Sequence, residues 1–93
     1  MSFYLKDPGS RIDYAIDWGA FYLDGQVVAG SAWSVFPAET DGVAVEASSF
    51  DLARTAATLS GGIAGHVYSV GNRVTLSDGR VDERSITLRV EER

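Results

Sequence analysis

Cysteine is absent from the sequence, so no disulfide contributes to the stability of the fold. The absence leaves the redox compartment open, because only some environments support disulfides. Histidine occurs once, as His66, which excludes a metal site built on two histidines of one chain. Because His66 stands beside a glycine at the start of an expected strand, we interpret it as a structural residue.

Basic residues and long apolar runs are also scarce. The sequence has eight lysines and arginines and thirteen acidic residues, which gives a net charge of −5. An acidic surface disfavours nucleic-acid binding, because phosphate contacts need basic side chains. No stretch approaches the roughly 20 apolar residues of a membrane span. Residues 1–7 contain no basic region followed by an apolar run, so the sequence shows no signal peptide. We therefore expect a small soluble protein without a nucleic-acid or membrane partner.

The composition itself is that of a folded protein. Hydrophobic residues make up 45% of the 93 positions and charged residues 23%, which predicts one globular domain over residues 1–93. Turn signals recur every 8–14 residues between six or seven short alternating segments, and no long helix is indicated. This pattern predicts an all-β fold, an antiparallel sandwich of about seven strands.

The last third of the chain predicts a β-hairpin. Alternate positions from 66 to 76 and from 86 to 90 place one set of side chains inward: His66, Tyr68, Val70, Asn72, Val74, Leu76, Ile86, Leu88 and Val90. A two-residue turn would pair the inward Val70 with the outward Thr87. A three-residue turn over residues 77–79 pairs Val70 with Ile86 and keeps both apolar sets on one face. That turn needs Gly79 in the left-handed region.

The same turn fixes two polar pairs and suggests the fold type. Asn72 is then opposite Arg84 on the inner face, and Arg73 is opposite Glu83 on the outer face. Tyr68 lies just after Gly65, at the start of the penultimate strand. This resembles the tyrosine corner of immunoglobulin-like domains, in which the hydroxyl binds backbone near the preceding crossover.

Earlier strands follow from shorter patterns. Residues 3–5 predict an edge strand or an arm, and residues 12–18 a strand with its even positions inward. From residue 27 the odd positions are expected inward, with Trp33 as the large anchor, until Pro37 ends the strand. Residues 43–47 and 55–59 predict two further strands. Residues 49–58 are also compatible with a short helix, although a loop feeding a strand is favoured, and residues 19–26 are ambiguous.

Candidate chemical sites are weak. Asp13 and Asp17 lie four positions apart on one strand, about 13 Å from each other, which is too far to share a proton or a metal. The glycines around residues 61–65 lack the lysine and the helix of a phosphate loop. The charged triplet at residues 82–84 fits an exposed hairpin strand. We therefore predict no catalytic residue, no cofactor and no bound metal.

Several segments together resemble a known family. They are Asp7-Pro8, Asp13-Tyr14, Asp17-Trp18, residues 31–35 (Ser-Ala-Trp-Ser-Val), residues 59–62, Gly65, residues 68–75 and residues 79–86. In this order they are similar to small virion proteins of tailed bacteriophages with an immunoglobulin-like sandwich, often described as fiber–tail adaptors or minor structural proteins. The block formed by the last two segments is the most specific.

The resemblance implies a non-enzymatic, multicopy structural protein of the virion, assembled in the host cytoplasm. It would link tail or neck subunits to fibers through protein–protein contacts. Two alternatives remain open: a capsid cement or decoration protein, and a cellular ligand-binding module of immunoglobulin type. The second would need an exposed aromatic platform, for which Trp18 and Tyr22 are the candidates.

Five aromatic residues are the candidate partner-binding residues. They fall at an end, in a link and at a strand edge, where a monomer has little need of them: Phe3, Tyr4, Phe21, Tyr22 and Phe36.

Overall fold

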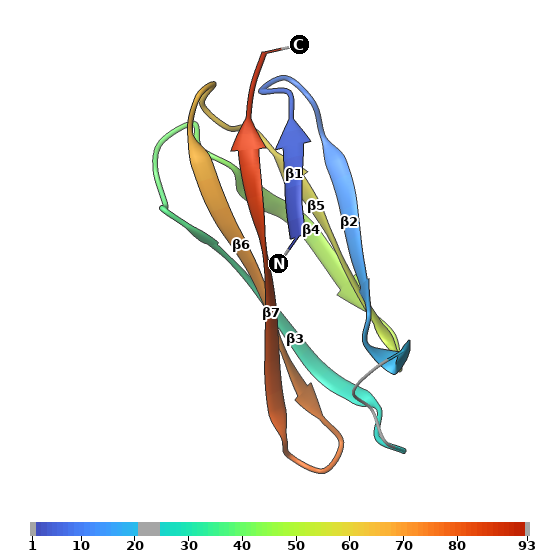
Figure 1. Cartoon of the computed structure of the whole chain (residues 1–93). Coiled ribbons are helices and arrows are strands. Elements are labelled where there is room, and N and C mark those ends of the chain that lie inside the picture. The colour runs from blue at the N-terminus through green and yellow to red at the C-terminus, as the bar shows by residue number, and fades with distance from the viewer. Residues whose placement is uncertain (1, 21–24, 93) are drawn as a thin grey trace.

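The computed structural model describes residues 2–20 and 25–92, and in them it forms seven β-strands (Figure 1). The elements are β1 (Ser2–Lys6), β2 (Ile12–Asp17), a 3₁₀ turn η1 (Trp18–Ala20), β3 (Val28–Phe36), β4 (Ala44–Phe50), β5 (Arg54–Ser60), β6 (Val67–Leu76) and β7 (Val81–Val90). The all-β prediction is confirmed. The helix considered for residues 49–58 does not form: β4 ends there, and β5 follows after a short turn.

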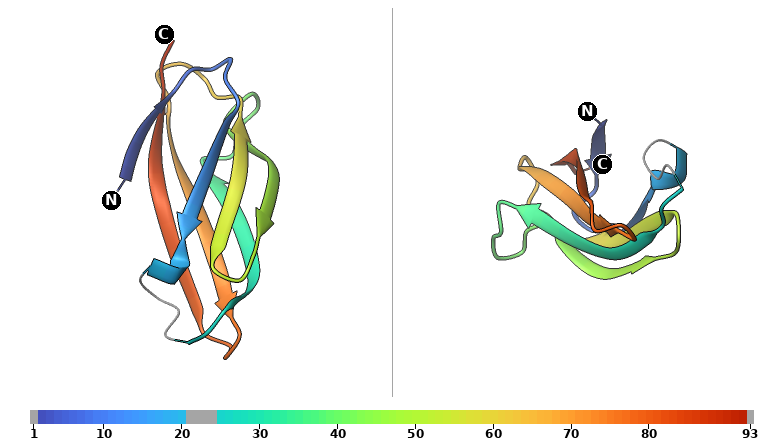
Figure 2. Two further views of the ribbon diagram at one scale, coloured as in Figure 1. Left: turned by 90° about the vertical axis from the view of Figure 1, so that its right-hand side faces the viewer. Right: turned by 90° about the horizontal axis from the view of Figure 1, so that it is seen from below.

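Two sheets face each other, as Figure 2 shows from the side and along the long axis. One has the strand order β1-β7-β6-β3 and the other β2-β5-β4. This is the connectivity of an immunoglobulin-like sandwich with its first strand moved to the sheet of the last. The strand pairs are antiparallel except one, because β1 runs parallel to β7 at the sheet edge. The Cα trace extends 42 × 21 × 18 Å.

The hairpin of β6 and β7 has the predicted register. Tyr68 is opposite Leu88 and Val70 opposite Ile86. The N–H of Leu76 donates to the carbonyl of Arg80 at 2.7 Å, and the N–H of Gly79 donates to the carbonyl of Leu76 at 2.9 Å. Gly79 has a φ of 92°, so the three-residue turn is confirmed.

β3 departs from the predicted alternation at its beginning. Val28 is opposite Leu76 and Gly30 is opposite Thr75, so Ala29 is an extra residue in a bulge. The bulge shifts the phase: Val28 is buried and Ala29 is exposed, so the expectation that position 29 faces inward is wrong. Beyond the bulge the odd positions face the core as predicted.

The largest buried side chain is Trp18, not the expected anchor Trp33. Trp18 is fully buried where β2 passes into η1, whereas Trp33 is only partly buried on the edge strand β3. The indole N–H of Trp18 donates to Thr55 Oγ1 at 3.0 Å and to Asn72 Oδ1 at 3.2 Å. A buried Trp18 also excludes it as an exposed aromatic platform for a ligand.

Asn72 is the polar centre of the core. It is fully buried, and its amide nitrogen donates to Ser31 Oγ at 2.9 Å and to the carbonyl of Ala32 at 3.1 Å. Its oxygen accepts from Thr55 Oγ1 at 2.7 Å. One side chain thus links β6 to β3 in its own sheet and to β5 in the other.

Tyr68 forms the predicted corner at the upper end of the sandwich, the end that carries the C-terminus in Figure 1. Its ring is fully buried, and its oxygen accepts from the N–H of Ile63 at 3.2 Å. The hydroxyl donates to the Glu39 carboxylate, which lies 2.9 Å from Nδ1 of His66. Burial raises the pKa of Tyr68, and the two hydrogen bonds lower the pKa of Glu39.

Lys6 also fastens the upper end. Its side chain is buried, and Nζ donates to the carbonyls of Asp7 at 3.0 Å, Ser10 at 2.6 Å and Gly61 at 2.6 Å. Burial lowers the pKa of this ammonium. Three carbonyls around one cation hold the β1–β2 and β5–β6 connections together. Within residues 2–20 and 25–92, no helix is long and apolar enough to cross a membrane.

Candidate docking surfaces

The upper half of the four-stranded sheet has apolar side chains on its outer face. The register aligns Leu5 of β1, Arg89 of β7 and Val67 of β6 in one row. Phe36 of β3 lies one row below, opposite Ser69. Phe36 is 77% exposed, and Leu5 and Val67 are each 46% exposed. We call Leu5, Val67 and Phe36 the upper sheet face.

The predicted partner-binding aromatics do not form one cluster. Phe36 is on the upper sheet face, and the backbone of Phe3 is opposite Thr87 in the same row. Phe21 and Tyr22 lie outside the described residues. Tyr4 belongs to β1, which is separated from β3 by two strands in the sheet order.

Tyr4 packs in the opening between the two sheets. Its position opposite Leu88 places it on the inner side, where its ring centroid is 5.5 Å from that of Tyr14. The Tyr14 ring is in turn 6.2 Å from Trp33, and both contacts are edge-to-face. Burial and the neighbouring Tyr4 raise the pKa of Tyr14. Tyr4 is still 43% exposed, so it both packs internally and remains accessible.

A groove of about 520 Å³ runs between the edge strands β3 and β4. Its apolar lining comes from both sheets, and its upper rim is acidic. The lining residues are Trp33, Ser34, Val35, Ala38, Glu39, Asp41, Gly42, Val43, Ala44 and Val45.

The outer face of the three-stranded sheet is shallow and built from small side chains. Two hollows of about 380 and 330 Å³ share Ser49 of β4 and Ala56 of β5. Phe50 lies at one end of them and is 47% exposed. Small residues let another backbone approach closely, but nothing in this face selects a partner.

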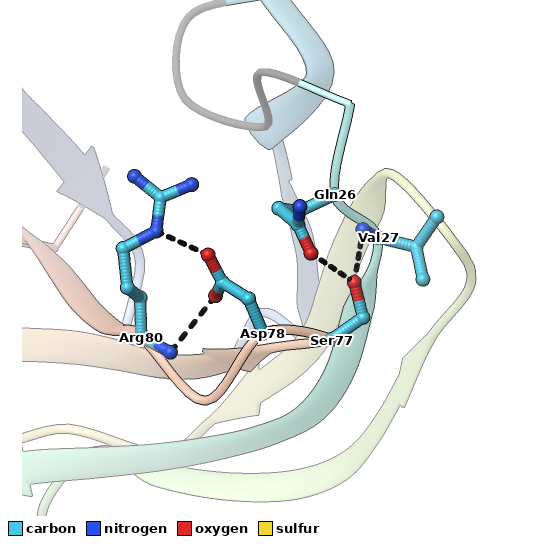
Figure 3. Close-up of polar contacts among 5 residues, drawn as sticks. All are labelled: Gln26, Val27, Ser77, Asp78 and Arg80. Atoms are coloured by element: carbon cyan, nitrogen blue, oxygen red, sulfur yellow. Dashed lines mark hydrogen bonds and ion pairs between the residues drawn. The ribbon is translucent and has the colours of Figure 1, made fainter.

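The lower end of the sandwich holds a fixed hairpin tip (Figure 3). Ser77 Oγ accepts from the N–H of Val27 at 3.1 Å and donates to Gln26 Oε1 at 2.6 Å. The Asp78 carboxylate accepts from the backbone N–H of Arg80 at 3.0 Å and from its Nε at 2.7 Å. These bonds lower the pKa of Asp78. The tip is therefore tied to the chain that enters β3.

A comparison with protein families identifies the family of this chain. The family model described as the podophage GP4 fiber-tail adaptor protein gp77 matches residues 6–89. The chain belongs to this family. No curated protein matches it.

Membership of this family means that the adaptor has a structural role in the virion, as the resemblance implied. It also implies that the adaptor binds other tail and fiber proteins. The matched range includes β2 to β6 in full and all but the last residue of β7. The exposed surfaces described above are therefore candidate binding surfaces for tail and fiber proteins.

The polar clusters of the adaptor are used in internal bonds. In the described residues, no group of three or more acidic, histidine or cysteine side chains is placed to hold a metal ion. The Glu39 carboxylate bonds to both His66 and Tyr68, and Tyr68 also accepts from the backbone N–H of Ile63, so the cluster ties the β3–β4 connection to the β5–β6 connection. This arrangement agrees with the structural interpretation of His66.

Sequence reasoning did not include Leu5 and Val67 among the candidate partner-binding residues. Strand alternation gave the signal for Val67, which is at an outward position of β6. Leu5 needed the parallel pairing of β1 with β7, which no local pattern encodes. The groove beside β3 likewise depends on which strands end up at the sheet edges.

Proposed function

We propose that this adaptor joins tail or neck subunits to fibers through the upper sheet face, with Phe36 as the central apolar anchor. The observation that supports this is the 77% exposure of Phe36 at the end of a strand whose other side is packed in the core. Aromatic side chains at protein interfaces supply large contact area at low entropic cost.

The surroundings of Phe36 suit a contact of fixed geometry. Its partner across the ladder is the small residue Ser69, so the ring projects from a low surface. Near Phe36, the hydrogen bond of the Tyr68 corner and the three hydrogen bonds of Lys6 hold the connections at the upper end in place. A rigid scaffold lowers the ordering cost of docking.

The adaptor acts, in this proposal, without catalysis and in several copies per particle. It has no nucleic-acid or membrane partner, and it joins the particle in the host cytoplasm. Its net charge of −5 favours a partner with a more basic surface, because complementary charge accelerates encounter.

Replacement of Phe36 by serine in the phage that encodes the adaptor tests this proposal. Leu52→Ser is the matched control, because Leu52 is 66% exposed at the lower end. Circular dichroism and thermal unfolding of both purified variants establish that the fold persists. We expect Phe36→Ser particles to lack the adaptor or to carry fewer copies, and Leu52→Ser particles to be normal. Equal copy numbers in both would refute the role of Phe36, and absence of the parent protein from purified particles would refute the virion function itself.

A further inference from the structure

β3 is the end strand of its sheet, and its central part has none of the usual protection of an edge. Residues 30–36 include no charged residue and no proline. Such an edge is a template for another strand, and proteins normally block it with charges, prolines or bulges. The facing edge strand β4 is blocked in this way by a bulge at Glu46, whose carboxylate pairs with Arg11 at 2.6 Å.

The hairpin register shows which backbone groups of β3 face outward. Leu76 donates to Arg80, so its backbone points toward β7 and that of Thr75 points toward β3. Backbone groups alternate in direction along a strand. The even residues of β3 therefore face β6, and the odd residues Ser31, Trp33 and Val35 face the open edge. Each has one N–H and one C=O, which gives three donors and three acceptors.

Both ends of this open edge are defined. At the lower end the N–H of Val28 already donates to the carbonyl of Leu52 at 2.9 Å. At the upper end Pro37 follows Phe36 and stops the strand. In the described part of the chain, no other strand pairs with the stretch between them. The free length suits an added strand of about five residues.

The groove between β3 and β4 lies beside this edge and sets the chemistry of the added strand. Its middle is lined by apolar side chains, among them Trp33, Val35 and Val45. Its upper rim carries Glu39 and Asp41. Every second side chain of an added strand would face the groove. Apolar side chains fit its middle, and a lysine or arginine fits its upper rim.

We propose that β3 accepts an extended segment of another virion protein by β-strand addition, with apolar side chains in the groove and a basic residue at Glu39 and Asp41. This rests on the proposed virion function and adds the binding mode. A second copy fits less well, because β3 has no basic residue to offer the acidic rim. The added strand would also extend the sheet beside Phe36.

Amide hydrogen exchange tests the proposal directly. Exchange is measured by mass spectrometry for peptides covering residues 28–36 and 44–50, in the free adaptor and in purified particles. We expect slower exchange for up to three amides of β3 in particles only, with β4 as the internal reference. Unchanged β3 exchange in particles that contain the adaptor would overturn strand addition and leave the proposed function standing. The β3 amides could instead be protected already in the free adaptor, and the free adaptor could sediment as a dimer. That result would identify the added strand as part of a second copy and would also overturn the proposal.

A pair of substitutions at Val35 separates the backbone contribution from packing. Val35→Pro removes an outward N–H but no bond to β6, a position where proline is tolerated. Val35→Ala removes similar packing and keeps the N–H. We expect Val35→Pro to bind up to about tenfold more weakly than Val35→Ala, since one hydrogen bond is worth up to about a factor of ten in affinity, and therefore to be present in fewer copies per particle. Equal copy numbers would contradict the proposal. If Val35→Pro does not fold, the exchange measurement on the parent protein decides.

Discussion

Tyr68 accepts a hydrogen bond from the N–H of Ile63 at 3.2 Å, which joins the start of β6 to the crossover before it. The ring is fully buried, so removal of the hydroxyl leaves that N–H and the Glu39 carboxylate without this partner. We expect Tyr68→Phe to lower the free energy of unfolding by about 1–3 kcal/mol. Urea denaturation measures the change. A midpoint equal to that of the parent protein would mean that the corner contributes nothing.

Asn72 should be more sensitive than its neighbour Arg73. Asn72→Ala removes bonds to Ser31, Ala32 and Thr55 inside the core, at a cost of about 1–3 kcal/mol for each buried group left unsatisfied. Arg73 is exposed on the outer face, and Arg73→Ala should change stability by only about 0.5 kcal/mol or less. Chemical denaturation of the two variants compares them. Similar losses in both would contradict the buried network.

Gly79 tests the turn of the β6–β7 hairpin. Its φ is 92°, and a Cβ there would meet no atom within 4 Å. A Cβ at Gly79 meets no clash, so we expect the cost of Gly79→Val to be mainly conformational, about 1–3 kcal/mol, because branched side chains resist positive φ. Asn tolerates this region, so Gly79→Asn should cost less. Thermal unfolding of the two variants gives the order, and the reverse order would exclude this turn.

Acid should weaken the Glu39 contacts in a defined direction. Bonds from Tyr68 and His66 hold the pKa of Glu39 below its ordinary value of 4.5. As pH falls, the unfolded chain binds this proton before the folded one does. The stabilisation is therefore complete above about pH 4.5 and is lost as pH drops through the lowered pKa.

Comparison of the parent with Glu39→Gln isolates this carboxylate from Asp51 and Asp78, whose pKa values are also lowered. The melting temperature of the parent should exceed that of Glu39→Gln at pH 5.5, and the difference should shrink at pH 3. A difference that does not depend on pH would show that charge on Glu39 is unimportant.

The sequence predicted the parts of the fold that depend on local alternation. The register of β6 and β7 followed from two apolar faces and one glycine, because only one turn length keeps Val70 opposite Ile86. The bulge at Ala29 was missed, since an extra residue leaves no mark in a run of small side chains. The sequence also did not predict that Trp18, and not Trp33, is the largest buried side chain. Trp33 is only partly buried because β3 is an edge strand, and which strand lies at the edge depends on the order of all strands in the sheet.

The candidate site was predictable only in part. Phe36 was predicted as a partner-binding residue because it is an aromatic residue at a strand edge, and the structure places it on an exposed face. The separation of Tyr4 from Phe36 depends on long-range pairing of β1 with β7, and the contacts of Lys6 join residues that are 55 positions apart. Such contacts arise from tertiary packing, which periodicity does not report.

Hydroxyl-radical footprinting of intact particles and of the free adaptor tests most directly the claim that the upper sheet face is the contact. Oxidation of Phe36, Leu5 and Val67 is measured by mass spectrometry, with Leu52 and Val81 as exposed apolar references at the lower end of the sandwich. We predict that oxidation of Phe36 falls strongly in particles while that of Leu52 is unchanged. Equal oxidation of Phe36 in both states would contradict the account.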